Sequence, residues 1–407
     1  LRDYGTATWD GGDPACAHSV GGQVQDSKAP GAIQTGVRPG VDASQCRKCG
    51  ARRVDSQIGL EQTPDAYVAE MVAVFREVRR VLRDDGTCWL NLGDSYASST
   101  KGTGGPTAKQ KTNAGAFFEP RKFNMGDCKE RDPMGIPWRV AFALQADGWY
   151  LRQDIVWSKP NPMPESVTDR CTKAHEYVFL LTKSARYFYD AKAIAEPSIT
   201  DDPRRPYTSE GAKALDGRAE WKSGEKRDGG DFSTRNRRSV WPIATQPYSG
   251  AHFATMPPEL AETCIKAGSS ERGQCPHCGA PWARTMLVTA PDGRTAIAVG
   301  NMRGASVDGR PLIGDNMIDA GTRGSFNAKN GVLKRETTGW AQSCACPAHD
   351  PIPQTILDPF GGAGTTALVA DRLQRDATII ELNPTYAALA RNRINGEAGL
   401  FSSVVLE

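Results

Sequence analysis

Apolar residues repeat at helical spacing in a segment that begins just after residue 63. The repeating positions are Val68, Met71, Val72, Phe75, Val78 and Leu82. Thr63 can cap the first turn and Pro64 suits the first helical position, whereas the two acids and a glycine at 84–86 end the pattern. The sequence therefore predicts an amphipathic helix that begins at Pro64 and stops before residue 84.

Continuous apolar runs predict buried strands over residues 87–92, 150–157 and 175–182, with a helix around 138–146. Residues 98–135 interrupt this pattern, because the stretch STKGTGGPTAKQKTNAG has three lysines, no acid and almost no apolar residue. We expect this insertion to be a mobile loop.

From Thr355 onward the pattern reads strand, glycine-rich turn, helix, strand, helix. This alternation is typical of a doubly wound α/β unit. We expect one Rossmann-like α/β domain with a mixed sheet.

Composition narrows the class of protein without identifying a partner. The 407 residues are 39% hydrophobic and 24% charged, which is enough for one sizeable core with insertions or for two modest domains. The net charge of +3 is too small to indicate a polyanionic partner by itself. No run of about 18 apolar residues and no signal-peptide pattern is present, so we expect a soluble cytoplasmic protein with no membrane partner.

The glycine-rich turn is the first candidate site. Its glycines let the backbone approach a ligand, with the N–H groups of the following helix pointing at it. Glu381 ends the next strand, 20 residues after Gly361, where an acid can accept both hydrogen bonds of a ribose diol. The candidate cofactor-binding residues of this unit are Asp358, Pro359, Phe360, Gly361, Gly362, Gly364, Thr365 and Glu381.

Several ligands compete for this turn. The absence of a lysine in its Gly-Thr-Thr end argues against ATP, and the missing third glycine argues against a dinucleotide. S-adenosylmethionine needs only the turn, the acid and polar groups, and Asp358 can pair with its ammonium. The structural alternative is a plain βα turn, but strand, turn, helix and acid in register favour the cofactor.

The 11 cysteines include close pairs that favour metal sites over a disulfide framework. Two Cys-x-x-Cys-Gly patterns are zinc knuckles, and a second pair of ligands can complete each as a tetrahedral structural Zn²⁺ site that would help its insert to fold. The expected ligand sets are Cys16, His18, Cys46 and Cys49, and Cys275, Cys278, Cys344 and Cys346. The spare candidates are His277 and His349, the ordinary cysteines are Cys88, Cys128, Cys171 and Cys264, and free thiols are the alternative to metal.

Several segments resemble the bacterial and phage DNA methyltransferases that modify exocyclic amino groups. DPFGGAGTT is similar to the cofactor motif of that family, and IIELNPTYAALARNRI to the strand and helix after it. The resemblance extends to VFREVRRVLRDDGTCWLNLGDSYA, GWYLRQDIVWSKPNPMPES, HEYVFLLTKS and SVWPIATQPYSGAHFATMPPEL. It implies S-adenosyl-L-methionine as cofactor, double-stranded DNA as partner and a restriction-modification setting, with a homodimer left open.

The same resemblance assigns further residues. In the family, GAHFATMPPEL supplies the remaining wall of the cofactor pocket, which implies roles here for His252, Phe253, Ala254 and Pro257. A satisfied core histidine is the alternative for His252.

The order of the motifs resembles the permuted beta class, because the cofactor turn follows the segments of the catalytic side. The expected division is residues 1–60 as an N-terminal loop region with a zinc knuckle, 61–190 as the catalytic half with the mobile insertion 98–135, 191–240 as the target-recognition region, 241–274 and 347–407 as the cofactor-binding half, and 275–346 as a zinc-bearing insertion.

One element of the family is missing from the printed sequence. Its catalytic tetrapeptide, Asp/Ser/Asn-Pro-Pro-aromatic, occurs nowhere in the 407 residues. In similar proteins it stands just before a segment like LRDYG, and this sequence begins with that segment at Leu1, without a methionine. We therefore expect that the catalytic motif belongs upstream of Leu1, that truncation removed it, and that the polypeptide as printed is inactive or strongly impaired.

The family mechanism implies methyl transfer to adenine N6 or cytosine N4 of a flipped base, by direct in-line attack without a covalent enzyme intermediate. No cysteine follows a proline, which argues against cytosine C5 chemistry. Trp157 and Lys159 match the segment that lines the base pocket, and a core tryptophan is the alternative for Trp157. Asn91 and Asp94 follow a strand that faces the same crevice, with no assigned role.

Two basic stretches are candidates for DNA phosphate contacts. The candidate residues are Lys101, Lys109 and Lys111 in the loop and Arg235, Arg237 and Arg238 after the polar region. Solvated surface charge is the alternative.

The leading hypothesis is therefore a site-specific DNA amino-methyltransferase. Two alternatives remain: a non-catalytic zinc-ribbon DNA-binding protein that retains the cofactor fold, and an RNA or protein methyltransferase. The sequence leaves the target base and the recognition sequence open.

Overall fold

In the computed structural model the described residues are 6–18, 45–55, 57–61, 63–97, 128–197, 234–246, 256–289, 295–299, 305–307, 310–312, 334–397 and 404–405. The helices are α1 (Pro64–Val81), α2 (Ile136–Ala146), η1 (Lys192–Ile194), α3 (Pro258–Gly268), α4 (Thr365–Arg372) and α5 (Pro384–Glu397). The strands are β1 (Thr8–Asp10), β2 (Arg52–Val54), β3 (Thr87–Leu92), β4 (Tyr150–Ser158), β5 (His175–Thr182), β6 (Glu196–Pro197), β7 (Thr234–Arg235), β8 (Val240–Pro242), β9 (Ala283–Thr289), β10 (Thr295–Val299), β11 (Ala305–Val307), β12 (Arg310–Leu312), β13 (Lys334–Ala341), β14 (Thr355–Asp358) and β15 (Asp376–Ile379). Among the helices of these segments, none is long and apolar enough to cross a lipid bilayer.

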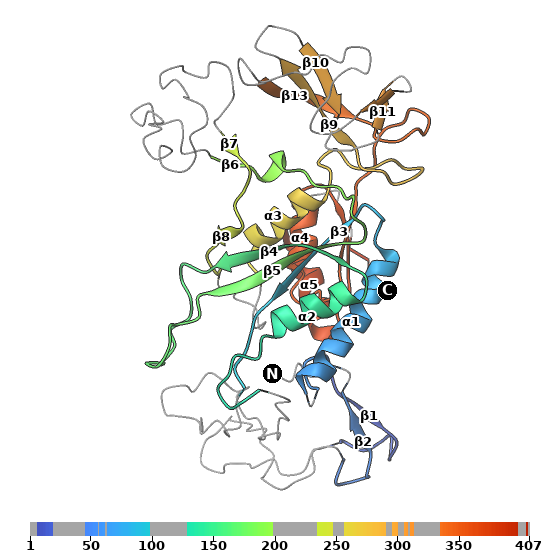
Figure 1. Ribbon diagram of the computed structural model, residues 1–407. Coiled ribbons are helices and arrows are strands. Elements are labelled where there is room, and N and C mark those ends of the chain that lie inside the picture. The colour runs from blue at the N-terminus through green and yellow to red at the C-terminus, as the bar shows by residue number, and fades with distance from the viewer. Residues whose placement is uncertain are drawn as a thin grey trace.

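A mixed four-stranded sheet lies at the centre, in the order β3-β5-β4-β8 (Figure 1). Strand β5 is antiparallel to both of its neighbours, whereas β4 and β8 run parallel. β5 is buried from Val178 to Thr182, as expected for a strand that helices cover on both faces.

Successive side chains of β5 enter two different cores. Phe179 packs with Phe75 of α1 and Leu144 of α2 on one face of the sheet. Val178 packs with Leu260 of α3 on the other face. This alternation follows from the two-residue repeat of a strand and explains why the apolar run of β5 is continuous.

The expected cofactor-binding half contains a smaller parallel pair, β14 and β15, with α4 as the crossover between them. Helix α4 packs on α3 through Val369 and Ala370, and Leu357 of β14 packs against the core beneath α1 and α2. Among the described strands, β14 pairs only with β15 and β3 only with β5. Side-chain packing rather than a shared hydrogen-bond ladder therefore joins the two sheets.

Two small β units lie at opposite ends of the molecule (Figure 1). β1 and β2 form an antiparallel pair at the N-terminal end, and the antiparallel unit β10-β9-β13 lies at the other end. The sequence analysis did not predict these strands within residues 1–60 and 275–346.

The expected elements of the central body are confirmed. Thr63 accepts a hydrogen bond from the backbone N–H of Ala66, with Pro64 at the first position of α1. The expected mixed α/β sheet is present. Helix α2 begins at Ile136, earlier than the pattern indicated.

The end of the expected mobile insertion is hydrogen-bonded to the segment that follows β3. The N–H of Ala97 donates to the carbonyl of Asp132 at 2.8 Å, and that of Met134 to the carbonyl of Ser95 at 2.8 Å. Residues 128–135 contain no helix or strand, so this end of the insertion is a loop that is hydrogen-bonded to the segment after β3. Residues 98–127 lie outside the described part, and the mobility expected of the insertion stays a prediction.

Candidate functional site

The glycine-rich turn joins β14 to α4 by backbone contacts that leave little space for side chains. The N–H of Gly361 donates to the carbonyl of Ile380 at 2.8 Å, and a Cβ at Gly361 would lie 3.1 Å from that of Ile379. Gly364, the N-cap of α4, has φ of +73°, a conformation that favours glycine. The glycines therefore bring the turn against the end of β15.

Asp358 braces this turn from the last position of β14. One carboxylate oxygen accepts the N–H of Phe360 at 2.9 Å, and the other accepts the hydroxyl of Thr366 at 2.6 Å. A carboxylate has about four acceptor positions, so both oxygens retain capacity for a cationic ligand.

Glu381 bridges the turn and the strand end. Its Oε2 accepts the N–H of Gly362 at 2.7 Å and its Oε1 accepts the N–H of Asn383 at 2.8 Å. Glu381, the acid that the sequence analysis expected beside the glycine-rich turn, therefore contacts that turn.

Exposed apolar side chains flank this acid. Ile380 is 58% and Leu382 is 56% exposed, and Phe360 in the turn is 47% exposed. The ring of Phe360 lies with its centroid 6.4 Å from that of Phe75, which ties it to α1. Ile380 and Leu382 were not among the residues that the sequence analysis proposed for the site. The sequence pattern that could have indicated them is the apolar residue on each side of Glu381 at the strand end.

Two other predicted residues have different surroundings. The buried hydroxyl of Thr365 accepts a hydrogen bond from Arg393 of α5 at 2.9 Å, and Arg393 also binds the carbonyl of Ala363. Pro359 lies half-buried in the turn. A cofactor contact through the Thr365 hydroxyl stays a prediction, because its position holds α5 against the turn.

The predicted second wall of the cofactor pocket is largely outside the described residues. His252, Phe253 and Ala254 are not described, and Pro257 is the buried residue that precedes α3.

The place expected for the catalytic tetrapeptide is likewise outside the described part of the chain. Leu1 and the four residues after it are not described, and the description begins at Thr6. A catalytic motif upstream of Leu1 therefore stays a prediction, and none of the described residues is assigned its role.

Trp157 occupies the core at the end of β4. It is 4% exposed, and its indole N–H donates to the carbonyl of Ile243 at 2.8 Å. Lys159, ion-paired with Glu176, holds its ammonium 4.4 Å from the centroid of the Trp157 ring. The structure thus places Trp157 as a core residue under Lys159, and its role as a wall of a base pocket stays a prediction.

Asp94 and Asn91 have structural partners. Asp94 accepts the N–H of Ile136 at 3.0 Å and that of Gly135 at 3.2 Å, so its carboxylate caps α2. Asn91 donates its amide to the carbonyl of Tyr177 at 3.0 Å across the sheet.

The two predicted zinc-ligand sets are each brought together by the fold. In both sets the ligand atoms all lie within 4.8 Å of one another. In the first set the sulfurs of Cys16 and Cys46 are 3.9 Å apart, and the Cys49 sulfur is 3.2 Å from Nδ1 of His18. Such spacings suit ligands around one tetrahedral ion, since Zn–S bonds measure about 2.3 Å.

The two knuckles share one backbone conformation. In each, the glycine after the second cysteine has positive φ and donates its N–H to the carbonyl of the first cysteine at 2.8 Å: Gly50 to Cys46, and Gly279 to Cys275. Burial raises the pKa of the Cys275 thiol, but the N–H groups of Cys278 and His277 lower it more, to about 6. The neighbouring Cys278 and burial raise the pKa of Cys346 to about 12, so the N–H donors favour the metal-binding thiolate form at Cys275 in particular.

Arg235 and Arg238 share a carboxylate. Both guanidinium groups bind Glu196 Oε1, at 2.8 Å and 2.6 Å. Burial raises the pKa of Glu196, but hydrogen bonds from Arg238 and Arg235 outweigh this and lower it. The predicted phosphate contacts are therefore partly neutralised, and Lys101, Lys109 and Lys111 lie outside the described residues.

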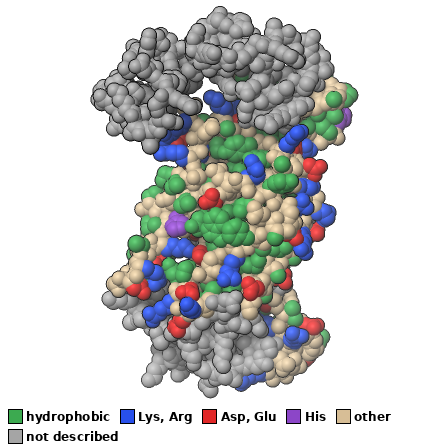
Figure 2. Space-filling model, viewed as in Figure 1, with side chains coloured by type: hydrophobic (Ala, Val, Ile, Leu, Met, Phe, Trp, Pro, Cys, Tyr) green, Lys and Arg blue, Asp and Glu red, His purple; other side chains and the backbone are tan. Residues whose placement is uncertain are grey.

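Charge is mixed elsewhere too. On the described part of the face in Figure 2, basic and acidic side chains lie among each other. The described part of this face therefore carries no broad basic surface.

Solved structures show a distant likeness. The cytosine-N4-specific PvuII DNA methyltransferase is 15% identical with a TM-score of 0.40, and the match covers 84% of this chain and 78% of that one. A candidate DNA modification methylase of Thermus thermophilus, in complex with S-adenosyl-L-methionine, is 16% identical with a TM-score of 0.38, covering 83% of this chain and 80% of the other.

The sequence matches are stronger. The family model for DNA methylases that act at N6 or N4 matches residues 32–302 and 349–392. Type II methyltransferase M.XycI of Xanthomonas campestris pv. cyanopsidis is 36% identical over 344 residues, 84% of this chain and 76% of that protein. Type II methyltransferase M.SmaI of Serratia marcescens is 34% identical over 340 residues, 83% of this chain and 77% of that protein. This chain therefore belongs to the N6/N4 DNA methylase family.

Proposed function

We propose that this protein transfers a methyl group from S-adenosyl-L-methionine to an exocyclic amino group, adenine N6 or cytosine N4, of a base in double-stranded DNA. The observation that carries the proposal is the contact between Glu381 and Gly362, which joins an acid at the end of β15 to a glycine turn without a phosphate-binding lysine. That arrangement suits a nucleoside cofactor that lacks phosphates.

Each part of the cofactor has a candidate partner. Glu381 would accept the ribose hydroxyls, and Asp358 would accept the ammonium group. The exposed apolar surface of Phe360, Ile380 and Leu382 would cover the adenine. When bound, the cofactor supplies an electrophilic methyl group on a sulfonium.

On the substrate side, the described residues would position the target base and would not form bonds with it. Base extrusion would bring the amino group toward the ends of β3 and β4, where Lys159 and Glu176 form their ion pair over Trp157. The Asp/Ser/Asn-Pro-Pro-aromatic tetrapeptide does not occur in the printed sequence, so we assign no catalytic residue.

The two cysteine-rich sets are proposed to hold one structural Zn²⁺ each. Four protein ligands fill a tetrahedral site and leave no position for a substrate. Cys275 and Cys278 lie directly before β9, and Cys344 and Cys346 follow β13, so this ion would close the base of the antiparallel unit.

Double-stranded DNA is the proposed partner, and Arg235, Arg237 and Arg238 are its proposed contacts, together with Lys101, Lys109 and Lys111. Because Glu196 binds two of these arginines, we expect Arg237 to contribute more than Arg235 or Arg238.

The function is tested in two steps. Isothermal titration of this chain with S-adenosyl-L-methionine should show one site. The product of the natural gene, given labelled cofactor and plasmid DNA, should then produce N6-methyladenine or N4-methylcytosine in nucleoside mass spectrometry. Label in RNA or protein but not in DNA would indicate the alternative substrate class. Cofactor binding or DNA binding without any methyl transfer would favour the non-catalytic DNA-binding protein.

A further inference from the structure

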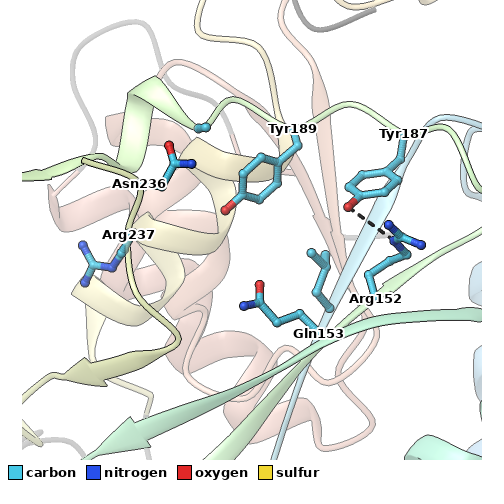
Figure 3. A pocket seen from close by; sticks show the side chains of 8 residues that line it. Arg152, Gln153, Tyr187, Tyr189, Asn236 and Arg237 are labelled. Carbon is cyan, nitrogen blue, oxygen red and sulfur yellow. Dashed lines mark hydrogen bonds between the residues drawn. The ribbon is translucent and has the colours of Figure 1, made fainter. Parts of the chain in front are cut away.

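The two edges of the central sheet carry different features. At the edge where β4 begins, a pocket of about 240 Å³ is lined mainly by polar side chains, among them Arg152 of β4 and Arg237 before β8. Their guanidinium groups lie on opposite sides of this pocket and point away from each other, with Tyr187 and Tyr189 between them (Figure 3). This pocket therefore does not bring its two cations to one anionic group.

The opposite edge of the sheet is where β3 and β4 end. Both strands are antiparallel to β5, so their carboxyl ends lie at the same edge. Open α/β sheets bind their ligands outside the carboxyl ends of the strands. The loop of residues 159–174, which joins β4 to β5 and is called here the β4–β5 loop, extends from this edge beyond the sheet (Figure 1). A ligand of the sheet would therefore meet this loop.

The β4–β5 loop has an apolar tip. Met163 is 86% exposed, the following Pro164 is also exposed, and Pro162 before it is half-buried. Three consecutive apolar residues thus stand at the surface. Such a run is unfavourable in water unless it serves a function.

Prolines stiffen this tip. Each proline has a fixed φ and also restricts the residue before it to extended conformations. Met163 stands between Pro162 and Pro164, so its backbone is confined from both sides. A side chain on a stiff backbone loses less conformational freedom on binding than one on a flexible loop. The tip is therefore suited to enter another molecule as a preformed unit.

Both arms of the loop are attached to other parts of the molecule. Asn161 donates its amide to the carbonyl of Thr245 at 3.0 Å and accepts the N–H of Thr245 at 2.9 Å. On the returning arm, the Arg170 guanidinium lies 4.3 Å from the centroid of the Tyr96 ring, in the segment after β3. These contacts orient the tip relative to the ends of β3 and β4.

We propose that Met163 is an apolar wedge that enters the DNA duplex and fills the space left by the extruded target base. Methionine and proline are among the side chains that proteins insert between base pairs. The partner is DNA because this chain belongs to a DNA methylase family. That a base is extruded rests on the proposed function.

The position of the wedge fits this role. Met163 follows Lys159 by four residues, and the Lys159 ammonium lies over the ring of Trp157 at the end of β4. The wedge would therefore enter the duplex beside the place toward which the target base moves. A side chain in the vacated space keeps the neighbouring base pairs apart and prevents the extruded base from returning.

The experiment compares the binding of three DNA duplexes by the product of the natural gene. The first duplex contains the sequence that this protein selects from random duplexes. The second has the same sequence with an abasic site at the extruded base, which is the position where an abasic site strengthens binding because no base has to be unstacked. The third lacks the selected sequence. S-adenosyl-L-homocysteine is present throughout, so that no methyl group is transferred.

Met163→Ala should weaken binding to the first two duplexes about tenfold, because the side chain fills the same space in both. Its affinity for the third duplex should equal that of the wild type, because no base leaves that duplex. Met163→Leu keeps an apolar side chain of similar volume and should stay within about threefold of the wild type. Val405→Ala is the matched control, because it removes another apolar side chain, 76% exposed and near the end of the chain. It should leave all three affinities unchanged.

The other outcomes would each contradict the wedge. An equal loss on all three duplexes would make Met163 a general DNA contact. No loss on any duplex, an equal loss in Val405→Ala, or no position at which an abasic site strengthens binding would also overturn the proposal. A change of oligomeric state in Met163→Ala with unchanged DNA affinity, seen in light scattering, would assign the tip to a second copy of the chain instead.

Methyl transfer is measured separately, on the first duplex with S-adenosyl-L-methionine. If Met163→Ala shows the expected losses but the wild type transfers no methyl group, the result counts against the proposed function alone. If the wild type transfers the methyl group and Met163→Ala binds all three duplexes as the wild type does, only the wedge is overturned.

Discussion

Glu381 accepts the backbone N–H of Gly362 at 2.7 Å, and this bond joins the end of β15 to the turn that follows β14. Glu381 therefore has two roles in the proposed site: it fixes the turn by this hydrogen bond, and it would accept hydrogen bonds from the ribose hydroxyls of the cofactor. Glu381→Ala should weaken cofactor binding by about 1–3 kcal/mol because both are lost.

Isothermal titration measures this change. Glu381→Gln keeps one acceptor oxygen and should fall between the wild type and the alanine variant. Glu397→Ala is the control, because Glu397 pairs with Arg372 at the end of α5. Equal cofactor affinity in the wild type and in Glu381→Ala would remove Glu381 from the site.

Gly364→Ala should destabilise the cofactor-binding half. Its φ of +73° strains any other residue, and a Cβ there would lie 2.9 Å from that of Ala390. We expect a loss of about 1–3 kcal/mol in the free energy of unfolding. Gly396→Ala is the matched control in α5: a Cβ there meets nothing within 4 Å, and the change should be neutral or stabilising by up to about 1 kcal/mol. Denaturant titration compares the two, and equal effects would contradict the argument.

Asp94→Ala should remove the cap of α2 without touching the cofactor site. Loss of the bonds to Ile136 and Gly135 should cost about 0.5–2 kcal/mol of stability. Asp65→Ala, at an exposed residue in the first turn of α1, should cost less than about 1 kcal/mol. Chemical denaturation gives both values, and a large loss of cofactor affinity in Asp94→Ala would show that Asp94 does more than cap a helix.

Metal analysis of the purified protein should find two zinc ions per chain, because two four-ligand sets are assembled. Cys46→Ser and Cys275→Ser should each remove one of them. Only Cys275→Ser should also weaken cofactor binding, because Gln274 beside it pairs with Ile352, just before β14. The first set lies with β1 and β2 at the far end of the molecule (Figure 1). Elemental analysis that finds no zinc in protein prepared without chelator would contradict the assignment.

The cysteines outside these sets should differ in reactivity. Burial raises the pKa of Cys88 and of Cys264 to about 12, so their thiols stay protonated at neutral pH. Cys171 is exposed. Iodoacetamide at neutral pH should therefore label Cys171 first, as peptide mass spectrometry can show. Labelling of Cys88 at the same rate would mean that the core around it opens readily.

Much of the site could be predicted from short stretches of sequence. The cap at Thr63, the glycines of the cofactor turn and the two Cys-x-x-Cys-Gly knuckles each depend on residues a few positions apart. Backbone conformation over such a span follows from local sterics and hydrogen bonds, and these can be inferred from the residue types. The acid at the end of the next strand was also predictable, because a βαβ unit fixes its distance along the chain.

Other features could be identified only from the tertiary structure. The pattern could not show that Glu196 binds Arg235 and Arg238, that Asp94 caps α2 or that Trp157 is a core residue. Each depends on which distant segments lie side by side, and that is set by the burial of apolar faces over the whole molecule.

The pocket lined by Arg152 and Arg237 shows the difference most clearly. Arg152 lies in the expected catalytic half, and Arg237 lies near the end of the expected target-recognition region. The sequence by itself determined the local elements, the glycine-rich turn and the Cys-x-x-Cys-Gly knuckles, because nearby residues specify them. Only the tertiary structure decided that Arg152 and Arg237 line the same pocket, since the parallel pairing of β8 with β4 brings their segments side by side.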